Sequence, residues 1–135
     1  MGIEENKRLA RRLVEEFLNQ RKLDVVDEIF SEDFVDHQGG LGPTGDRDSL
    51  RLFVRALMDA FSDGRFEIIQ LIAEGDSVLG HLEFNGTHSG VFRGVAATGK
   101  NVQNATMSVV RVANGKVVER WNITDWAALM QQITA

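Results

Sequence analysis

The first half of the chain shows apolar residues at helical spacing in three segments. In residues 3–20 the main apolar positions lie four residues apart, and charged side chains occupy the opposite side. Such spacing gathers the apolar positions on one face, which predicts an amphipathic helix. A short helix is predicted around residues 25–30 and a long one over 46–61, with a brief extended piece at 33–38 between them. The glycine-rich segment 39–45 interrupts the pattern before the long helix.

After Gly64 the apolar positions alternate with polar ones, which is the period of a β-strand. Four strands are predicted, over residues 66–73, 78–88, 101–112 and 116–124. Asn114-Gly115, between the last two, is a strong hairpin signal because both residues tolerate the positive φ of a two-residue turn. Residues 126–133 are predicted to form a short terminal helix.

The order of these elements indicates a single α+β domain over residues 1–135. Helices come first and an antiparallel meander follows, with no repeat or linker between them. A sheet of few strands needs helices to cover one face, and Gly80, Gly86 and Gly90 indicate that the sheet curves around them. A curved sheet closed by helices encloses a cavity, where a ligand is expected to bind.

Composition narrows the classes of function. The net charge is -5 and no basic run occurs, which argues against nucleic-acid binding. No apolar stretch reaches the roughly 20 residues that a membrane span requires. The chain has no cysteine, which excludes disulfides and thiolate chemistry, and no tyrosine, which excludes a phenol as proton donor. The N-terminus has no apolar core of a secretory signal, so a soluble, cytoplasmic protein is expected.

Three segments together resemble one known family. Residues 86–100 read G-T-H-S-G-V-F-R-G-V-A-A-T-G-K, and residues 111–125 read R-V-A-N-G-K-V-V-E-R-W-N-I-T-D. Both are similar to segments of the SnoaL-like proteins of the NTF2-like superfamily, "G-T-H-x-G-x-F-x-G-x-x-x-T-G-K" and "R-x-x-x-G-K-I-V-E-x-W-x-x-x-D". Residues 34–37 and the glycine-rich segment after them match the position of a further family segment. The resemblance covers nearly the whole chain in the same order.

The resemblance implies an NTF2-like (cystatin-like) cone, in which a curved antiparallel sheet packs on three N-terminal helices and a short C-terminal helix follows. It also implies a homodimer or higher homo-oligomer, and no metal or organic cofactor. The characterised cyclases of the family close polyketide rings by intramolecular aldol condensation with an aspartate as acid/base. On the matching motif this aspartate is Asp125.

Two roles are predicted for Asp125, a carboxylate in the pocket and the N-cap of a helix. By strand alternation it shares a face with Trp121 and Ile123, and an aromatic wall would raise the pKa of a carboxyl toward that of a general base. An aspartate directly before Trp126-Ala127 also suits the N-cap of the terminal helix, and the two roles are compatible.

Two histidines and an asparagine are further site candidates. His88 ends the apolar face of the second strand, where it either hydrogen-bonds a substrate oxygen or the catalytic carboxylate, or serves as a structural histidine. His37 is assigned to the cavity mouth, with a surface loop as the plainer account. Asn104 on the third strand either holds a substrate oxygen or faces solvent.

Three large side chains are assigned to the substrate-binding wall, and each is also explained as a core residue: Trp121, Phe53 and Met58. The three histidines show no metal-ligand spacing, so no metal site is expected. Residues 94–101 come close to a phosphate-binding loop, but Asn101 replaces the Ser or Thr and leads into a strand.

Two functions follow as hypotheses. The leading one is an acid/base enzyme of the lyase or isomerase type, in which Asp125 removes a proton next to a carbonyl while His88 or Asn104 stabilises the enolate. Its substrate would be a small to mid-sized apolar carbonyl compound, with a polyketide as the family precedent. The alternative is a non-catalytic module that binds an apolar ligand or a partner.

Overall fold

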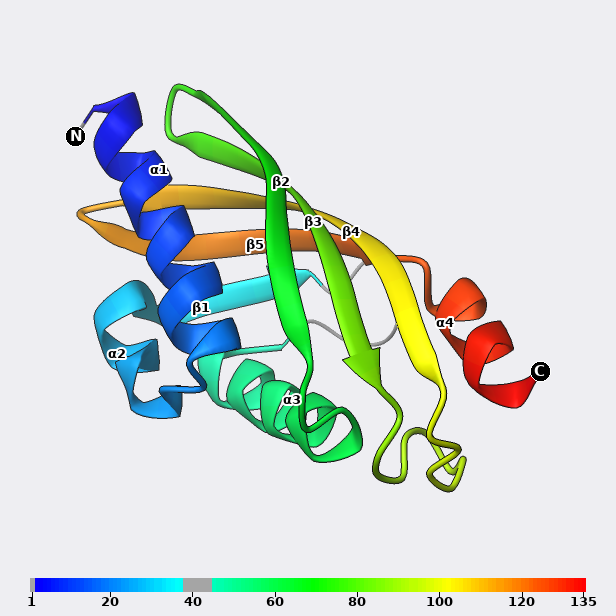
Figure 1. Cartoon of the computed structure of the whole chain (residues 1–135). Coiled ribbons are helices and arrows are strands. Elements are labelled where there is room, and N and C mark those ends of the chain that lie inside the picture. Colours follow the sequence, from blue (N-terminus) through cyan, green and yellow to red (C-terminus); the bar gives the residue numbers. More distant parts are fainter. Residues whose placement is uncertain (1, 38–44) are drawn as a thin grey trace.

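The computed structural model of the chain describes residues 2–37 and 45–135. Its elements (Figure 1) run in the order α1 (Ile3–Arg12), the π-helical segment η1 (Leu13–Asn19), the 3-10 turn η2 (Leu23–Val25), α2 (Val26–Ile29), β1 (Phe30–His37), α3 (Arg47–Ala60), β2 (Arg65–Glu74), β3 (Ser77–Thr87), β4 (Asn101–Ala113), β5 (Lys116–Thr124) and α4 (Trp126–Thr134). The predicted α+β cone is confirmed. Most of the glycine-rich segment at 39–45 lies outside the described residues.

The long helix α3 shows how local sequence sets an element's bounds. Asp46 precedes it in extended conformation, and its carboxylate accepts a hydrogen bond of 2.9 Å from the backbone N–H of Ser49. This bond satisfies one of the free N–H groups at the helix start, and it lowers the pKa of Asp46. Leu50, Val54 and Leu57 then recur on the buried side of the helix.

The sheet has five strands in the order β1-β5-β4-β3-β2. β2 to β5 form the predicted antiparallel meander. The extended piece expected at 33–38 is a full edge strand, β1, which pairs with β5 in parallel and sets Asp36 opposite Arg120. It begins already at Phe30, where the second helix was predicted to continue. Phe30 is fully buried, and a buried phenylalanine suits a helix as well as a strand, so its apolar character could not distinguish the two.

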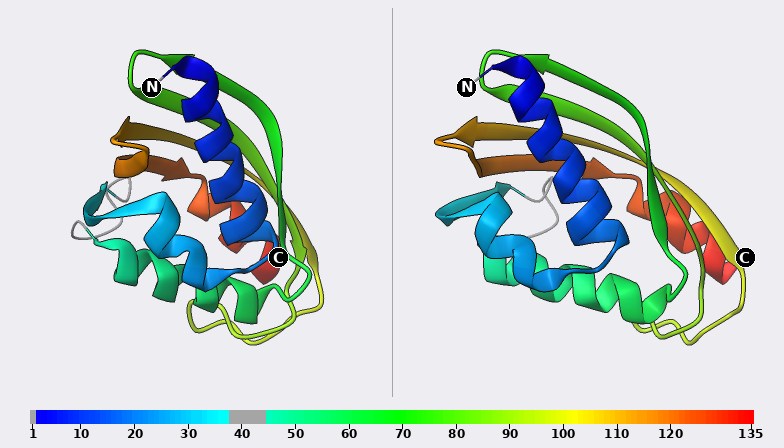
Figure 2. Two further views of the ribbon diagram at one scale, coloured as in Figure 1. Left: turned by 90° about the vertical axis from the view of Figure 1, so that its left-hand side faces the viewer. Right: turned by 60° about the vertical axis from the view of Figure 1, so that its left-hand side comes forward.

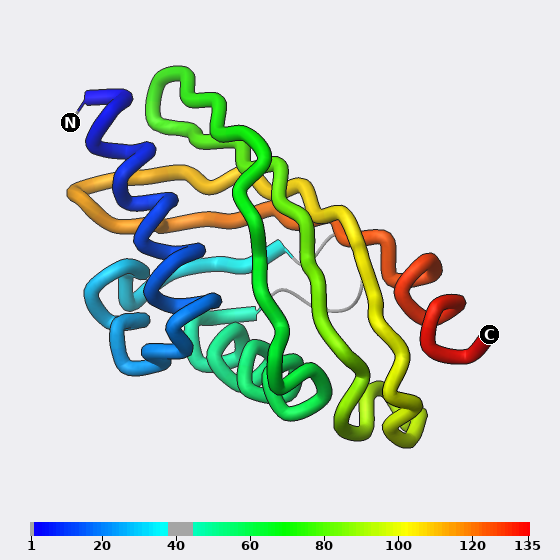
Figure 3. Tube along the Cα trace, viewed as in Figure 1, coloured from blue at the N-terminus to red at the C-terminus, as the bar shows by residue number. Residues whose placement is uncertain are grey.

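The strands curve around the helices. Figure 2 shows the sheet bending over α1 and α3, which lie on its concave side, and α4 at the far end of β4 and β5. The Cα trace in Figure 3 shows the two termini at opposite ends of the molecule. In the described part of the chain no helix is long and apolar enough to cross a membrane.

Aromatic rings fill the core beneath the helices. Phe30 lies between Phe17 and Phe34, with ring centroids 5.6 Å and 4.7 Å away and both pairs edge to face. A second apolar cluster, near α4, is centred on Phe61 and Phe84. Edge-to-face pairs of this kind stabilise a core beyond the area that they bury.

The two faces of the sheet differ in an unusual way. Arg120, Asn122 and Thr124 of β5 line the interior, so by alternation the residues between them point to the convex outer face. There Trp121 is 41% exposed and Ile123 is 70% exposed. In this part of β5 the polar side chains therefore lie inside and the apolar ones lie outside.

Candidate functional site

A pocket opens between the concave face of the sheet, α3 and α4. The space between its walls amounts to about 540 Å³, part of which is open to solvent. One wall is apolar and comes mainly from helices and from β2 and β3. Its residues are Leu18, Leu50, Phe53, Val54, Leu57, Phe66, Leu82, Phe84, Trp126 and Leu129.

The rest of the lining is a polar stripe on β4 and β5, which we define as Asn104, Thr106, Arg120, Asn122 and Thr124. Thr106 and Thr124 face each other in register, and their hydroxyls are 2.9 Å apart. The amide of Asn122 donates to the hydroxyl of Thr124 at 3.0 Å. Alternation within each strand aims these side chains into the same pocket.

Three polar atoms at the pocket are buried without a hydrogen-bond partner among the described residues. They are Nδ2 of Asn104, Oδ1 of Asn122 and Nε1 of Trp126. A buried polar atom without a partner costs about 1–3 kcal/mol, so native proteins rarely keep several of them together. Donors and an acceptor that line one pocket are well suited to bind a ligand with polar oxygens.

Arg120 brings a positive charge to the pocket wall. Its Nη1 donates to both carboxylate oxygens of Asp36, at 3.2 Å and 3.0 Å. The Asp36 side chain is 1% exposed and that of Arg120 is 16% exposed. Burial lowers the pKa of Arg120 and the Asp36 carboxylate opposes that shift, but an arginine keeps its proton in proteins. This pair leaves Nε and Nη2 of a desolvated cation for a ligand.

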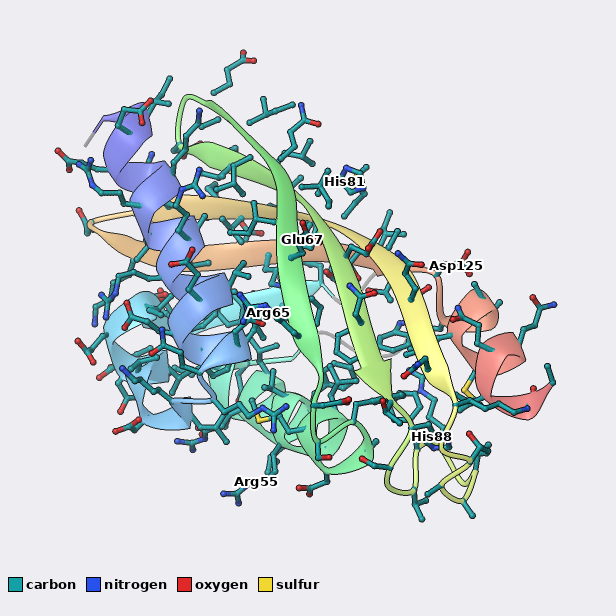
Figure 4. All side chains as sticks on the ribbon, in the orientation of Figure 1. Arg55, Arg65, Glu67, His81, His88 and Asp125 are labelled. Atoms are coloured by element: carbon teal, nitrogen blue, oxygen red, sulfur yellow. The ribbon has the colours of Figure 1, made fainter. Side chains whose placement is uncertain are left out.

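Of the two predicted places for Asp125, the helix cap is the one that the structure shows. Figure 4 shows Asp125 at the start of α4, where the side chain is exposed and its Oδ1 accepts a hydrogen bond of 3.0 Å from the backbone N–H of Ala128. Its neighbours Thr124 and Trp126 line the pocket, but Asp125 does not. The geometry is that of the helix cap.

This geometry gives a first prediction. Asp125→Ala should lower the free energy of unfolding by about 1 kcal/mol, because the first turn of α4 loses its cap. Asp125→Asn should leave stability nearly unchanged, because an asparagine oxygen also caps a helix. Urea unfolding of both variants measures this, and equal stability of the alanine and asparagine variants would contradict the capping role.

His88 is buried, as its place on the apolar face predicted, but it does not line the pocket. It lies just beyond β3 (Figure 4), where its Nδ1 contacts the Thr98 hydroxyl at 3.0 Å and accepts from the Thr98 backbone N–H at 3.3 Å. The ring of Phe61 packs against it, with centroids 5.5 Å apart. These contacts are those of a structural histidine, the second of the two predicted roles. Nε2 of His88 is buried without a partner among the described residues.

His37 and Trp121 lie together on the outer face, so neither lines the pocket. Their rings stack at 4.9 Å, and Nε2 of His37 is 2.9 Å from Glu119. Glu119 also accepts from Arg111 at 2.7 Å. The bonds from His37 and Arg111 lower the pKa of Glu119. The predicted place of Trp121 on the cavity wall is therefore wrong. For His37 the cavity mouth is wrong as well and the surface is the correct side of the molecule, although the residue ends strand β1 and does not lie in a loop.

The remaining candidates are divided between two cavities. Asn104 and Phe53 line the pocket as predicted. Met58 lines a smaller adjoining cavity with Phe61, beside Leu57 and Phe66, which the two cavities share. Within residues 2–37 and 45–135 no group of three or more histidines and carboxylates is arranged to hold a metal ion.

Sequence reasoning missed Arg120, Asp36, Asn122 and Thr124. The available signal was the alternation of β5, which places Arg120, Asn122 and Thr124 on one face. By its composition this face resembles a solvent-facing one, because the other face of the strand carries the tryptophan and the isoleucine.

The chain was compared with known proteins. A family model described as SnoaL-like polyketide cyclase matches residues 8–133. AclR of Streptomyces galilaeus, for which a hydroxylase activity has been put forward, is similar with a TM-score of 0.89 and 26% identity, covering 98% of this chain and 83% of AclR. IdmH of Streptomyces antibioticus, for which a polyketide cyclase activity has been put forward, is similar with a TM-score of 0.86 and 25% identity, covering 96% of this chain and 99% of IdmH.

A further solved structure supports the fold alone. A protein of Jannaschia sp. CCS1 assigned to the SnoaL-like polyketide cyclases has a TM-score of 0.91 at 24% identity, covering 100% of this chain and 96% of that protein. No curated protein matches the chain.

Proposed function

The chain belongs to the SnoaL-like polyketide cyclase family, and we propose that it is an enzyme that binds an apolar compound with several carbonyl groups and stabilises its enolate. The observation that carries this proposal is Arg120, a cation whose side chain is 16% exposed and the one charged group among the described residues that line the pocket. A cation in a low-dielectric site favours a negative charge that develops next to it.

The polar stripe supports a ligand with oxygens along one edge. Arg120 lies opposite Val110, six residues beyond Asn104 on β4. At about 3.3 Å per residue the two ends of the stripe are about 20 Å apart along the strand. The apolar part of the lining would hold a hydrocarbon body. An elongated compound with an apolar body and oxygens along one side would match both the polar stripe and the apolar lining of the pocket.

The reaction that fits these groups is an intramolecular aldol addition. A carbon between two carbonyls loses a proton, and Arg120 donates hydrogen bonds to the resulting enolate oxygen. The enolate carbon forms a bond with a second carbonyl carbon of the same molecule, and the new alkoxide takes up a proton. Asp36 is the positioning residue, because its contact with Nη1 fixes the guanidinium.

Asp125 has no part in this reaction as the acid/base group. Among the described residues, no carboxylate or histidine lines the pocket. We therefore assign the proton exchange to water at the open mouth. The same lack of a base favours the alternative, in which the pocket binds such a compound without converting it.

The test uses 2-acetyl-1-tetralone, a bicyclic β-diketone whose enolate absorbs at longer wavelength than the neutral forms. Bound to the native protein, it should ionise about one to three pH units lower than in buffer, because a cation lies next to its oxygen. Absorbance against pH measures the shift. The variant Asp36→Asn/Arg120→Gln, which replaces the ion pair by neutral amides, should bind the compound without the shift.

A second readout separates catalysis from binding. An enzyme should accelerate deuterium exchange at the carbon next to the carbonyl of 1-tetralone, followed by NMR in heavy water. Binding with an unchanged exchange rate would favour the binding module. The absence of any shift in the ionisation of the bound β-diketone would contradict the role of Arg120.

A further inference from the structure

A second cavity lies on the other side of Arg120, between α1, η1 and the strands β2 to β4. The space between its walls amounts to about 380 Å³, part of which is open to solvent. Its lining is apolar except for Ser108 and Arg120. The residues are Ala10, Leu13, Val14, Leu18, Leu71, Val78, Gly80, Leu82, Ser108, Val110 and Arg120.

The second cavity adjoins the first. Leu18, Leu82 and Arg120 line both, so the guanidinium lies at the boundary between the two spaces. A ligand oxygen at Arg120 therefore has one part of the molecule in the first pocket and another part directed toward the second. The two cavities differ in chemistry, since the polar residues Asn104, Thr106, Asn122 and Thr124 line only the first.

The roof of the second cavity comes from an irregular helix. Leu13, Val14 and Leu18 belong to η1, where the helix is wound as a π-helix. Wide turns of this kind are rare in proteins, and those that occur are often found at functional sites. They change which side chains face the sheet, and here the aliphatic side chains of η1 line the same cavity as Gly80.

We propose that this second cavity is a subsite for the hydrocarbon end of the substrate, an alkyl chain or a saturated ring, with the adjacent carbonyl at Arg120. The proposal rests on the proposed function for the place of the carbonyl. The aliphatic lining of the second cavity would not hydrogen-bond a part of the ligand that carries several oxygens. The polar stripe of the first pocket would bind that part instead.

Gly80 determines the depth of this subsite. A Cβ atom built on it would lie 3.5 Å from Leu71 Cδ2 and 3.8 Å from both Leu82 Cδ2 and Ser108 Oγ, which are ordinary contacts. An alanine therefore fits without displacing its neighbours, and a valine would extend into the cavity. Substitution at this position changes the space and leaves Arg120 in place.

The experiment uses alkyl phenyl ketones of increasing chain length, from acetophenone to octanophenone. Binding is followed by quenching of tryptophan fluorescence, since Trp126 lines the first pocket. Affinity for the native protein should rise about fourfold per methylene until the subsite is full. In Gly80→Val this rise should disappear, while acetophenone should bind within about twofold of native. In Gly80→Ala, the milder change, affinity should stop rising at a shorter chain length than in the native protein.

The matched control is Ala105→Val, which adds similar bulk to an exposed position on β4. It should keep the native dependence on chain length. An equal rise in Gly80→Val and in the native protein, or no rise in the native protein, would overturn the subsite. Failure of the enolate proposal would show instead as an unshifted ionisation of the β-diketone, and the chain-length result would be unaffected.

Discussion

Replacement of Arg120 by glutamine is expected to lower the free energy of unfolding by about 3–5 kcal/mol. The reason is the carboxylate of Asp36, which is 1% exposed and whose described side-chain hydrogen bonds both come from Arg120. Without the guanidinium a buried negative charge would have no cation beside it. Urea unfolding at neutral pH measures the effect.

Two further variants identify the cause. In Asp36→Asn/Arg120→Gln the interior is neutral, so most of the lost stability should return, as is often seen when both members of a buried ion pair are replaced. Arg111→Gln removes an arginine from the outer face, where its partner Glu119 also contacts His37. It should change stability little, because exposed ion pairs contribute little. A double variant as unstable as Arg120→Gln would show that packing, not charge, is responsible.

Replacement of Asn104 by leucine is expected to have opposite effects on stability and on binding. Asn104 is 5% exposed, and its Nδ2 is buried without a partner. An apolar side chain of similar size removes that cost, so the free protein should gain about 1 kcal/mol in free energy of unfolding. A ligand oxygen that pairs with Nδ2 would lose its donor, so an elongated polyketone that reaches from Arg120 to Asn104 should bind about tenfold more weakly, whereas 2-acetyl-1-tetralone, whose two oxygens lie together at Arg120, should not.

The comparison variant is Asn85→Leu, at an exposed position near the end of β3. It should alter neither stability nor binding appreciably. Lower stability of Asn104→Leu together with unchanged affinity would mean that this amide serves the fold and not the ligand. Thermal unfolding and fluorescence titration on the same samples give both values.

Most of the fold followed from local patterns in the sequence. The strands β2 to β5 showed alternation over eight or more residues, and Asn114-Gly115 marked one hairpin; both have positive φ in the structure, 52° and 75°. The parallel pairing of β1 with β5 was not predictable in this way. It joins residues more than 80 positions apart, as Asp36 and Arg120 are, and no local signal specifies such a partner.

The candidate site was harder to predict because alternation defines two faces without saying which is inside. Trp121 was assigned to the cavity wall, and Ile123 shares its face of β5; both are exposed. The interior set is Arg120, Asn122 and Thr124, which resembles a solvent-facing pattern. A face that lines a polar pocket has the composition of a surface, so hydrophobicity alone gives the wrong side.

The edge strand β1 places adjacent residues in opposite surroundings. The carboxylate of Asp36 is enclosed beside Arg120, whereas the imidazole of the next residue, His37, stacks on Trp121 outside. A shift of β1 along β5 by a single position would exchange them, bringing an imidazole against the guanidinium and turning the acid toward water. Loss of one residue from β1 would therefore leave the cone intact in outline and yet deprive its interior cation of a counter-ion.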